Sequence, residues 1–224
     1  MKVELSDENI SAIDIYIREI NNWNTKADLT ALKGYESIFV NLFLDAFTLL
    51  PFIKDKSTLI DIGTGGGFPG LALKIFYKEL KITLVEASSK KCVFLNYISN
   101  CLKMKNVNVV WGRAEDVGKD IFYREQYDYA CCRAVAGMSA ISELCMPFVK
   151  IGGVFVASKG KDTTEIKQAA TAINYMGGKI EKIEKIKYSF FSEEKNIVII
   201  SKDRQTPEKY PRRNGIPQKR PVKV

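Results

Sequence analysis

Residues 61–70 have the sequence Asp61-Ile62-Gly63-Thr64-Gly65-Gly66-Gly67-Phe68-Pro69-Gly70. The stretch joins an apolar segment, 59–62, to a helix that Pro69 can open at its first position. Glycines permit a sharp turn and let a ligand approach the backbone, and open α/β sheets bind ligands at the carboxyl ends of their strands. The stretch therefore predicts a strand, a turn and a helix that hold a nucleotide-type ligand.

From Ser57 onward, short β-branched segments alternate with helical ones, a pattern typical of βαβ units and a parallel sheet. Five strands are predicted at 59–62, 82–86, 107–111, 127–132 and 154–158. Two more, near 183–190 and 197–201, are joined by polar residues as a hairpin, although the spacing of Ile180, Ile183 and Ile186 also fits a helical turn. The predicted fold class is α/β and Rossmann-like, a mostly parallel seven-stranded sheet that ends in an antiparallel hairpin.

A helical N-terminal extension is predicted before this sheet, over residues 1–50. Four isoleucines recur at helical spacing after the candidate caps Ser6 and Asp7: Ile10, Ile13, Ile17 and Ile20. A second apolar stripe covers 38–50 and ends before Pro51. Residues 21–30 are too polar and broken for either period, so we expect a loop there. The domain with the sheet then spans 51–203, and a tail spans 204–224.

The tail carries most of the net charge of +8, since it holds seven basic residues and a single acid, Glu208. It also contains four of the seven prolines, which fix φ and remove donors: Pro207, Pro211, Pro217 and Pro221. We therefore expect an extended tail with no regular helix that becomes ordered on a polyanionic partner. The alternative is a solvated tail that only improves solubility.

Composition limits the chemistry that the chain can perform. It has no histidine, which excludes Ser-His and Cys-His nucleophilic schemes and HExxH metal sites. The five cysteines form no CxxC pair, so we expect no metal site and a reducing compartment. No window approaches the run of about 18 apolar residues of a membrane span, and the start lacks the layout of a signal peptide. The expectation is a cytoplasmic monomer without a membrane partner.

Three acids at strand ends help to distinguish the possible cofactors. Gly65 to Gly70 satisfies GxGxxG, so an NAD(P)-dependent oxidoreductase must be weighed. Asp61, just before the glycines, would repel a pyrophosphate but can accept from the ammonium of an amino-acid moiety. Glu86 can bind two ribose hydroxyls of either cofactor, and Glu115, with Asp116, can border an adenine. Each acid alone could be a surface cap or a turn residue. Together they favour S-adenosylmethionine and a class I methyltransferase.

The chain resembles the RsmG (GidB) family over nearly its whole length. The resemblance is carried by these segments: the glycine stretch 61–70, Leu84 to Lys91, Phe94-Leu95, Gly112 to Asp116, Arg133-Ala134, Asp28 to Thr30, Leu44-Asp45 and Tyr210 to Arg213. It implies transfer of a methyl group from S-adenosylmethionine to N7 of a guanosine in small-subunit rRNA. The cofactor contacts that it implies are Gly63, Phe68, Ala114, Glu115 and Arg133. The family usually has a histidine shortly before Leu-Asp-Ser, whereas here Asn41 stands nearby and Asp45-Ala46 follows.

Methylation at guanine N7 needs no general base, because N7 presents a lone pair and carries no proton. Arg133 and Lys159 are then expected to bind guanine O6, a phosphate or the cofactor carboxylate. Five tail residues combine an aromatic ring with cations that suit RNA: Tyr210, Arg212, Arg213, Lys219 and Arg220. The RNA substrate is then either naked rRNA or rRNA in an assembly particle. Cytosine C5 transfer is disfavoured because Cys131-Cys132 lacks a preceding proline. A non-catalytic RNA-binding module remains a further alternative.

Overall fold

The computed structural model describes residues 4–133 and 135–222, so Ala134 and Lys223 lie outside the described residues. These residues form a seven-stranded sheet in the order β3-β2-β1-β4-β5-β7-β6. The strands are β1 (Thr58–Ile62), β2 (Lys81–Glu86), β3 (Val107–Trp111), β4 (Tyr127–Arg133), β5 (Val149–Lys159), β6 (Gly178–Ile186) and β7 (Lys195–Lys202). Strands β1 to β5 pair in parallel, and β7 pairs antiparallel with both β5 and β6. The predicted fold class is confirmed.

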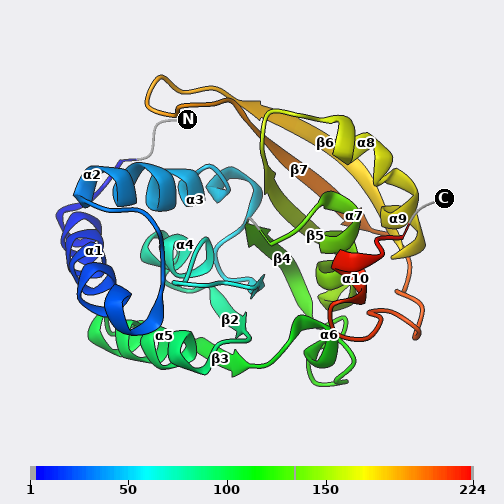
Figure 1. Ribbon diagram of the computed structural model, residues 1–224, viewed down its shortest axis with the longest axis horizontal. Helices are drawn as coiled ribbons and strands as arrows, with labels where there is room; N and C mark the ends of the chain where they lie inside the picture. Colours follow the sequence, from blue (N-terminus) through cyan, green and yellow to red (C-terminus); the bar gives the residue numbers. More distant parts are fainter. Residues whose placement is uncertain (1–3, 134, 223–224) are drawn as a thin grey trace.

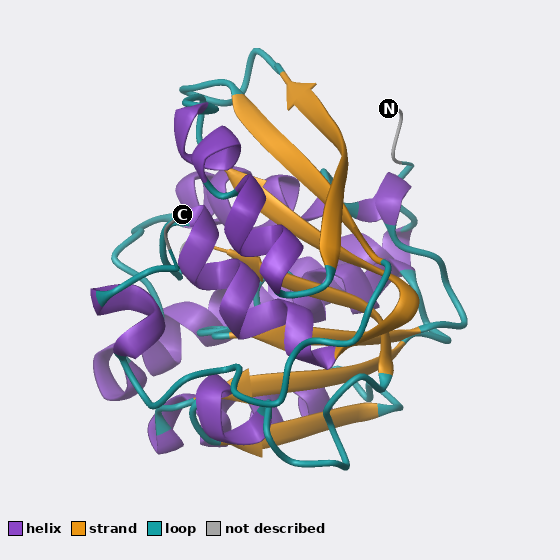
Figure 2. Cartoon of the chain, turned by 90° about the vertical axis from the view of Figure 1, so that its right-hand side faces the viewer, coloured by secondary structure: helices purple, strands orange, loops and turns teal. Residues whose placement is uncertain are grey.

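Helices cover both faces of the sheet (Figures 1 and 2). One face carries α1 (Asp7–Ala27), α2 (Tyr35–Ile38), the π-helical turn η1 (Phe39–Leu44), α3 (Asp45–Phe47), η2 (Leu50–Phe52), α4 (Gly70–Phe76) and α5 (Ser89–Cys101). The other carries α6 (Ala114–Val117), α7 (Met138–Cys145), η3 (Met146–Phe148), α8 (Thr164–Gln168), α9 (Ala170–Tyr175) and α10 (Ile216–Lys219). Each layer has its own apolar cluster, so alternate residues of the strands are buried on opposite sides.

The N-terminal helix is longer than expected. Ser6 caps it in a reciprocal pair of hydrogen bonds with Asn9, as its position suggested. Residues 21–27, expected in a loop, instead continue the helix to Ala27, because Trp23 packs against the rings of Phe94 and Tyr97 on α5. This tertiary contact outweighs the weak local helix preference of the polar residues around it.

The predicted hairpin is real, but its first strand starts earlier than expected, at Gly178, and ends at Ile186. Its pairing with β7 shifts register between Ile180 and Lys182. A bulge of this kind adds one residue, so Ile180 and Ile183 both pack into the same apolar layer in spite of a spacing of three. The spacing that imitates a helical turn is therefore a property of a bulged strand.

One apolar helical segment, Tyr35–Phe52, is long enough to cross a membrane by length and composition, contrary to the expectation that no segment approaches such a run. Half of it is buried within the protein. Its side chains Ile38, Phe43 and Leu49 are among the most deeply buried residues of the core. The segment therefore packs as a core helix of a globular domain.

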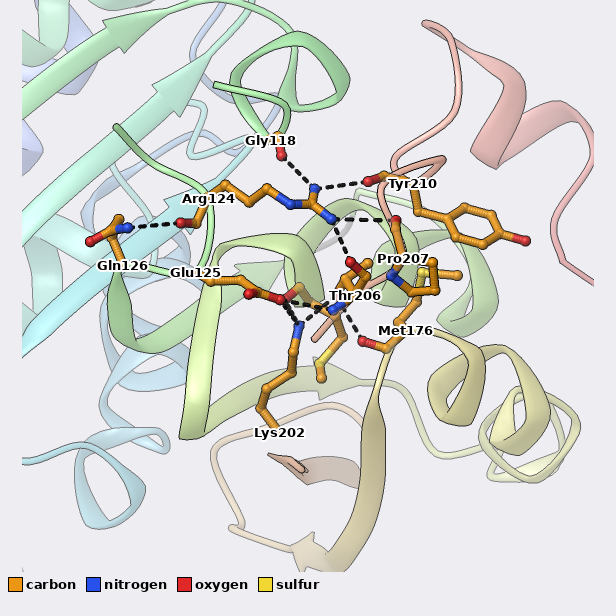
Figure 3. Close-up of polar contacts among 10 residues, drawn as sticks. Gly118, Arg124, Glu125, Gln126, Met176, Lys202, Thr206, Pro207 and Tyr210 are labelled. Carbon is orange, nitrogen blue, oxygen red and sulfur yellow. Dashed lines mark hydrogen bonds and ion pairs between the residues drawn. The ribbon is translucent and has the colours of Figure 1, made fainter. Parts of the chain in front are cut away.

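The tail also differs from the expectation of an extended, unattached segment. Figure 3 shows Arg124 between the main domain and the tail, where its guanidinium donates to the carbonyl oxygens of Thr206 at 2.6 Å and Tyr210 at 2.8 Å. Pro217 is buried, and the single helical turn α10 follows Gly215. Prolines exclude a long helix but not one turn, and buried partners order the rest.

A buried lysine lies next to the start of the tail. Lys202 donates to the Met146 carbonyl at 2.7 Å and to the Thr206 hydroxyl, and its Nζ lies 3.3 Å from Glu125 (Figure 3). Its side chain has no exposed surface, and this burial lowers its pKa from 10.5 to about 8. The unfolded chain thus binds more protons than the folded chain between pH 8 and 10.5.

We therefore expect the contribution of Lys202 to stability to rise with pH across that interval. The free energy of unfolding of the wild type, relative to Lys202→Met, should increase by roughly 2–3 kcal/mol between pH 7 and pH 10. Urea unfolding of both proteins at several pH values measures this difference. A difference that does not change with pH would contradict the assignment.

Candidate functional site

The glycine turn follows the carboxyl end of β1. Hydrogen bonds to the side chain of Asp61, three residues before the turn's Thr64, hold it in place. The carboxylate Oδ2 of this residue accepts from the Thr64 hydroxyl at 2.6 Å and from the Gly70 N–H at 2.8 Å. The side chain is fully buried, and burial raises its pKa to about 6 against the opposing effect of these hydrogen bonds. Oδ1 has no hydrogen-bond partner within residues 4–133 and 135–222. Asp61 thus lies under the turn and retains one unsatisfied acceptor.

A tyrosine of α1, which is not among the predicted site residues, holds the turn from the other side. The Tyr16 hydroxyl donates to the Gly66 carbonyl at 2.7 Å, and its ring stacks on Phe68 at 5.3 Å. Gly67 has a φ of +93°, and a Cβ there would lie 2.1 Å from the Tyr16 oxygen. Tyr16 occupies the same helical face as Ile13, Ile17 and Ile20, a spacing that could have indicated its burial.

Glu86 closes the turn from the neighbouring strand. Its carboxylate accepts from the Gly65 N–H at 2.9 Å and from the Ser88 N–H at 2.8 Å. The structure therefore brings the strand-end acids Asp61 and Glu86 to the same turn, as parallel neighbouring strands require. In this conformation both carboxylates bind backbone amides of the protein itself.

The third predicted acid contacts the tail. Glu115 is buried, and its carboxylate accepts from the Gly215 N–H at 2.8 Å, while Asp116 accepts from Asn214 at 2.8 Å. Ala114 begins α6 beside it and is half-buried against the core. The tail therefore packs next to the side chains that were expected to border the adenine.

Arg133, at the end of β4, lies between the turn and the helical segment α2–α3. Its guanidinium lies 5.8 Å from the centre of the Phe68 ring and donates to the Asn41 carbonyl at 2.6 Å. It also forms an ion pair of 2.9 Å with Asp45, whose other oxygen binds Lys195. Asp45 is buried, so the two cations compensate its charge where water cannot. Lys195 comes from a polar hairpin, and no local pattern predicted that it belongs to this cluster.

Two neighbouring hollows open at this end of the sheet. A cavity of about 250 Å³ is lined by the turn, α1 and the loop after it, at Ile20, Leu29, Thr30, Leu42, Gly63, Thr64, Gly65, Gly66, Phe68 and Arg133. A wider cleft of about 380 Å³ shares Thr30, Leu42 and Arg133 with the cavity and reaches Asn41, Asp45, Lys159 and Lys195. The shared residues make the two hollows parts of one site, which combines a glycine-lined end and a cationic end.

The predicted RNA contacts are distributed unevenly. Lys159 lines the cleft but is paired with Glu165 at 2.9 Å. Tyr210 is buried, and Arg212 forms hydrogen bonds through its backbone and its guanidinium with the fully buried Glu143, at 2.6 Å for the shortest. Arg213, Lys219 and Arg220 are exposed. The tail thus presents some cations to solvent and uses others to hold itself in place.

Similarity to known proteins identifies the family of the chain. A family model described as "rRNA small subunit methyltransferase G" matches residues 9–198. The chain belongs to the rRNA small subunit methyltransferase G family. Curated relatives that bear this name include the protein of Acetivibrio thermocellus, 43% identical over 98% of this chain and 91% of its own. The protein of Alkaliphilus metalliredigens is 40% identical over 98% and 93%.

Solved structures with the same fold are much more distant in sequence. One is a methyltransferase of Aquifex aeolicus that depends on S-adenosylmethionine, with a TM-score of 0.55, 16% identity, and coverage of 73% of this chain and 92% of that one. Another is fibrillarin of Aeropyrum pernix with natively bound S-adenosylmethionine, with a TM-score of 0.55, 13% identity, and coverage of 72% and 75%. The prediction of a methyltransferase with S-adenosylmethionine as cofactor is confirmed, and neither alternative, oxidoreductase or non-catalytic module, is supported.

Proposed function

We propose that the chain transfers the methyl group of S-adenosylmethionine to N7 of one guanosine in 16S rRNA, the RNA of the small ribosomal subunit. The observation that carries this proposal is the continuity of the glycine-lined cavity with the cationic cleft, joined at Arg133. The glycine-lined cavity suits a nucleoside methyl donor without phosphates. The cationic cleft suits a nucleotide of RNA, which is a polyanion. We further propose that the protein works as a monomer in the cytoplasm, on naked rRNA or on an assembly particle.

Residues in and around the cavity fit the donor. Asp61 lies fully buried under the turn with Oδ1 unpaired in the described chain and would accept from the amino group, while Gly63 and Gly65 line the cavity beside it. Glu86, now bound to two amides, would accept from ribose hydroxyls, and Ala114 and Glu115 would border the adenine. Phe68 and Arg133 would complete the set of contacts. Bound S-adenosylmethionine supplies an electrophilic methyl group on a sulfonium.

The contribution of the protein to the chemistry is to position the acceptor base. Guanine N7 loses no proton, so the cleft does not need a base, in keeping with a chain that has no histidine. Arg133 is anchored on Asp45 and the Asn41 carbonyl, and it can therefore hold guanine O6 or a phosphate in a fixed place.

The test uses purified protein, labelled S-adenosylmethionine, and either small subunits or deproteinised 16S rRNA lacking the modification. We expect one 7-methylguanosine per molecule, located by chain cleavage at the modified base. Arg133→Lys keeps the charge but loses the planar guanidinium, and should lower kcat/KM at least about 10-fold. Absence of N7 methylation on both substrates would overturn the proposal.

A further inference from the structure

The loop that joins β6 to β7, residues 187–194, has an aromatic composition that the catalytic site does not explain. Tyr188 and Phe190 stack almost parallel, with ring centres 5.1 Å apart and an angle of 11°, and Phe191 packs edge-on against Phe190 at 4.7 Å. A hydrogen bond of 3.1 Å from the Phe191 N–H to the Tyr188 carbonyl closes the turn between them. Phe190 is 46% exposed, so an apolar ring faces solvent on a preformed turn.

This loop is connected to the cationic cleft. The ammonium of Lys195 lies 4.5 Å from the centre of the Phe191 ring and also pairs with Asp45 in the cleft. In Figure 1 the loop extends beyond the sheet toward the side occupied by α2 and α3, and the contact of Lys195 with Asp45 places the start of β7 there. The aromatic surface is therefore adjacent to the hollow that contains Arg133, Lys159 and Lys195.

Exposed flat rings beside a row of cations suit one class of ligand, single-stranded nucleic acid. Bases stack on aromatic side chains independently of sequence, while cations neutralise phosphates. The cations of the cleft lie next to the loop through Lys195, and Asp45 among them is buried and compensated. In the loop itself Glu193 is exposed and Glu194 pairs with Lys187. A base that leaves its stack to enter the cleft also exposes its neighbour, which then needs a new stacking partner.

We propose that the aromatic loop, residues 187–194, stacks a nucleotide adjacent to the target guanosine through Tyr188 and Phe190, while Lys195 holds the phosphate between them. This inference rests on the proposed function, because the cleft beside the loop is taken to receive the guanosine. The loop thus sets the position of the unpaired RNA segment at the entrance to the cleft.

The experiment compares the wild type with Tyr188→Ala/Phe190→Ala, the conservative pair Tyr188→Phe/Phe190→Tyr, and the control Phe122→Ala. Phe122 is an aromatic residue that is 80% exposed and does not line either hollow. Binding of 16S rRNA is measured without methyl donor over a range of salt concentrations. Steady-state KM for RNA and calorimetric affinity for S-adenosylmethionine are measured in parallel, and the latter also reports on folding.

The double alanine variant should bind RNA about 10-fold or more weakly and show a KM for RNA raised to match, since stacking of one base contributes about this much. The slope of affinity against salt should stay unchanged, because no cation is lost. The conservative pair and Phe122→Ala should behave like the wild type. The inference would be overturned if the double alanine variant kept the RNA affinity and the KM for RNA of the wild type. It would also be overturned if Phe122→Ala lost as much RNA affinity as the double alanine variant. Failure of the proposed function is a separate result, namely the absence of 7-methylguanosine with the wild type.

Discussion

Gly67→Ala should destabilise the protein and weaken cofactor binding at the same time. The new Cβ would lie 2.1 Å from the Tyr16 hydroxyl oxygen and 2.9 Å from Leu71 Cδ1, at a φ of +93° that side chains rarely adopt. Overpacking and backbone strain together predict a loss of about 3–5 kcal/mol in the free energy of unfolding. Since the turn lines the cavity, affinity for S-adenosylmethionine should also fall by about 100-fold.

A glycine with a similarly positive φ but free space around it provides the control. Gly152 has a φ of +81°, and an added Cβ there meets no atom of the described chain within 4 Å. Gly152→Ala should cost only about 1–2 kcal/mol and leave cofactor affinity unchanged. Adding Tyr16→Phe to Gly67→Ala removes the closest clashing atom and should restore part of the stability. Equal effects of the two alanine substitutions would show that Tyr16 does not constrain the turn.

Glu143→Gln should have the second large effect, through the tail. Glu143 has no exposed side-chain surface, and its carboxylate accepts from the backbone N–H, Nε and Nη2 of Arg212. Substitution leaves the partly buried guanidinium without a counter-ion, and we expect a loss of roughly 3–5 kcal/mol. The measurement is urea unfolding, followed by limited proteolysis of the tail.

The same experiment should reveal whether the tail supports the cofactor site. Glu115 accepts from Gly215 in the tail, so release of the tail would remove one partner of that acid and weaken binding of S-adenosylmethionine. Glu8→Gln is the control, because the pair of Glu8 with Lys78 is exposed and should contribute little. This account would be contradicted if the tail of Glu143→Gln resisted protease and its free energy of unfolding equalled that of Glu8→Gln.

The sequence predicted the succession of strands and helices along the chain well, because the signal for each element is local. Alternating burial and glycine punctuation are properties of a few adjacent residues, as in 107–111, where the predicted strand matches β3. The boundaries were wrong where a distant residue decides them. Trp23 keeps 21–27 helical through rings on α5, and a bulge in β6 places Ile180 and Ile183 on the same face.

The candidate site was predictable, like the fold, only where the signal is local. Asp61, Glu86 and Arg133 stand at strand ends and were found from position, or from resemblance in the case of Arg133. Tyr16, Asp45 and Lys195 come from a helix, another helix and a hairpin, and no local pattern connects them. The sequence also did not predict which tail cations form ion pairs within the protein, because the partner of Arg212, Glu143, lies 69 positions away along the chain.

The glycine stretch 61–70 by itself determined that a strand, a turn and a ligand-binding hollow occur here, since Gly63, Gly65 and Gly67 adopt positive φ values without the steric cost that a side chain adds. The tertiary structure alone decided what surrounds the hollow. It buried the carboxylate of Asp61 under the turn, paired Arg133 with Asp45, and docked the basic tail on Glu115 and Glu143. A buried charge needs a partner of opposite charge or a hydrogen-bond donor close by. The tertiary structure decides which residue this is, because the partner is close in space but can be distant along the sequence.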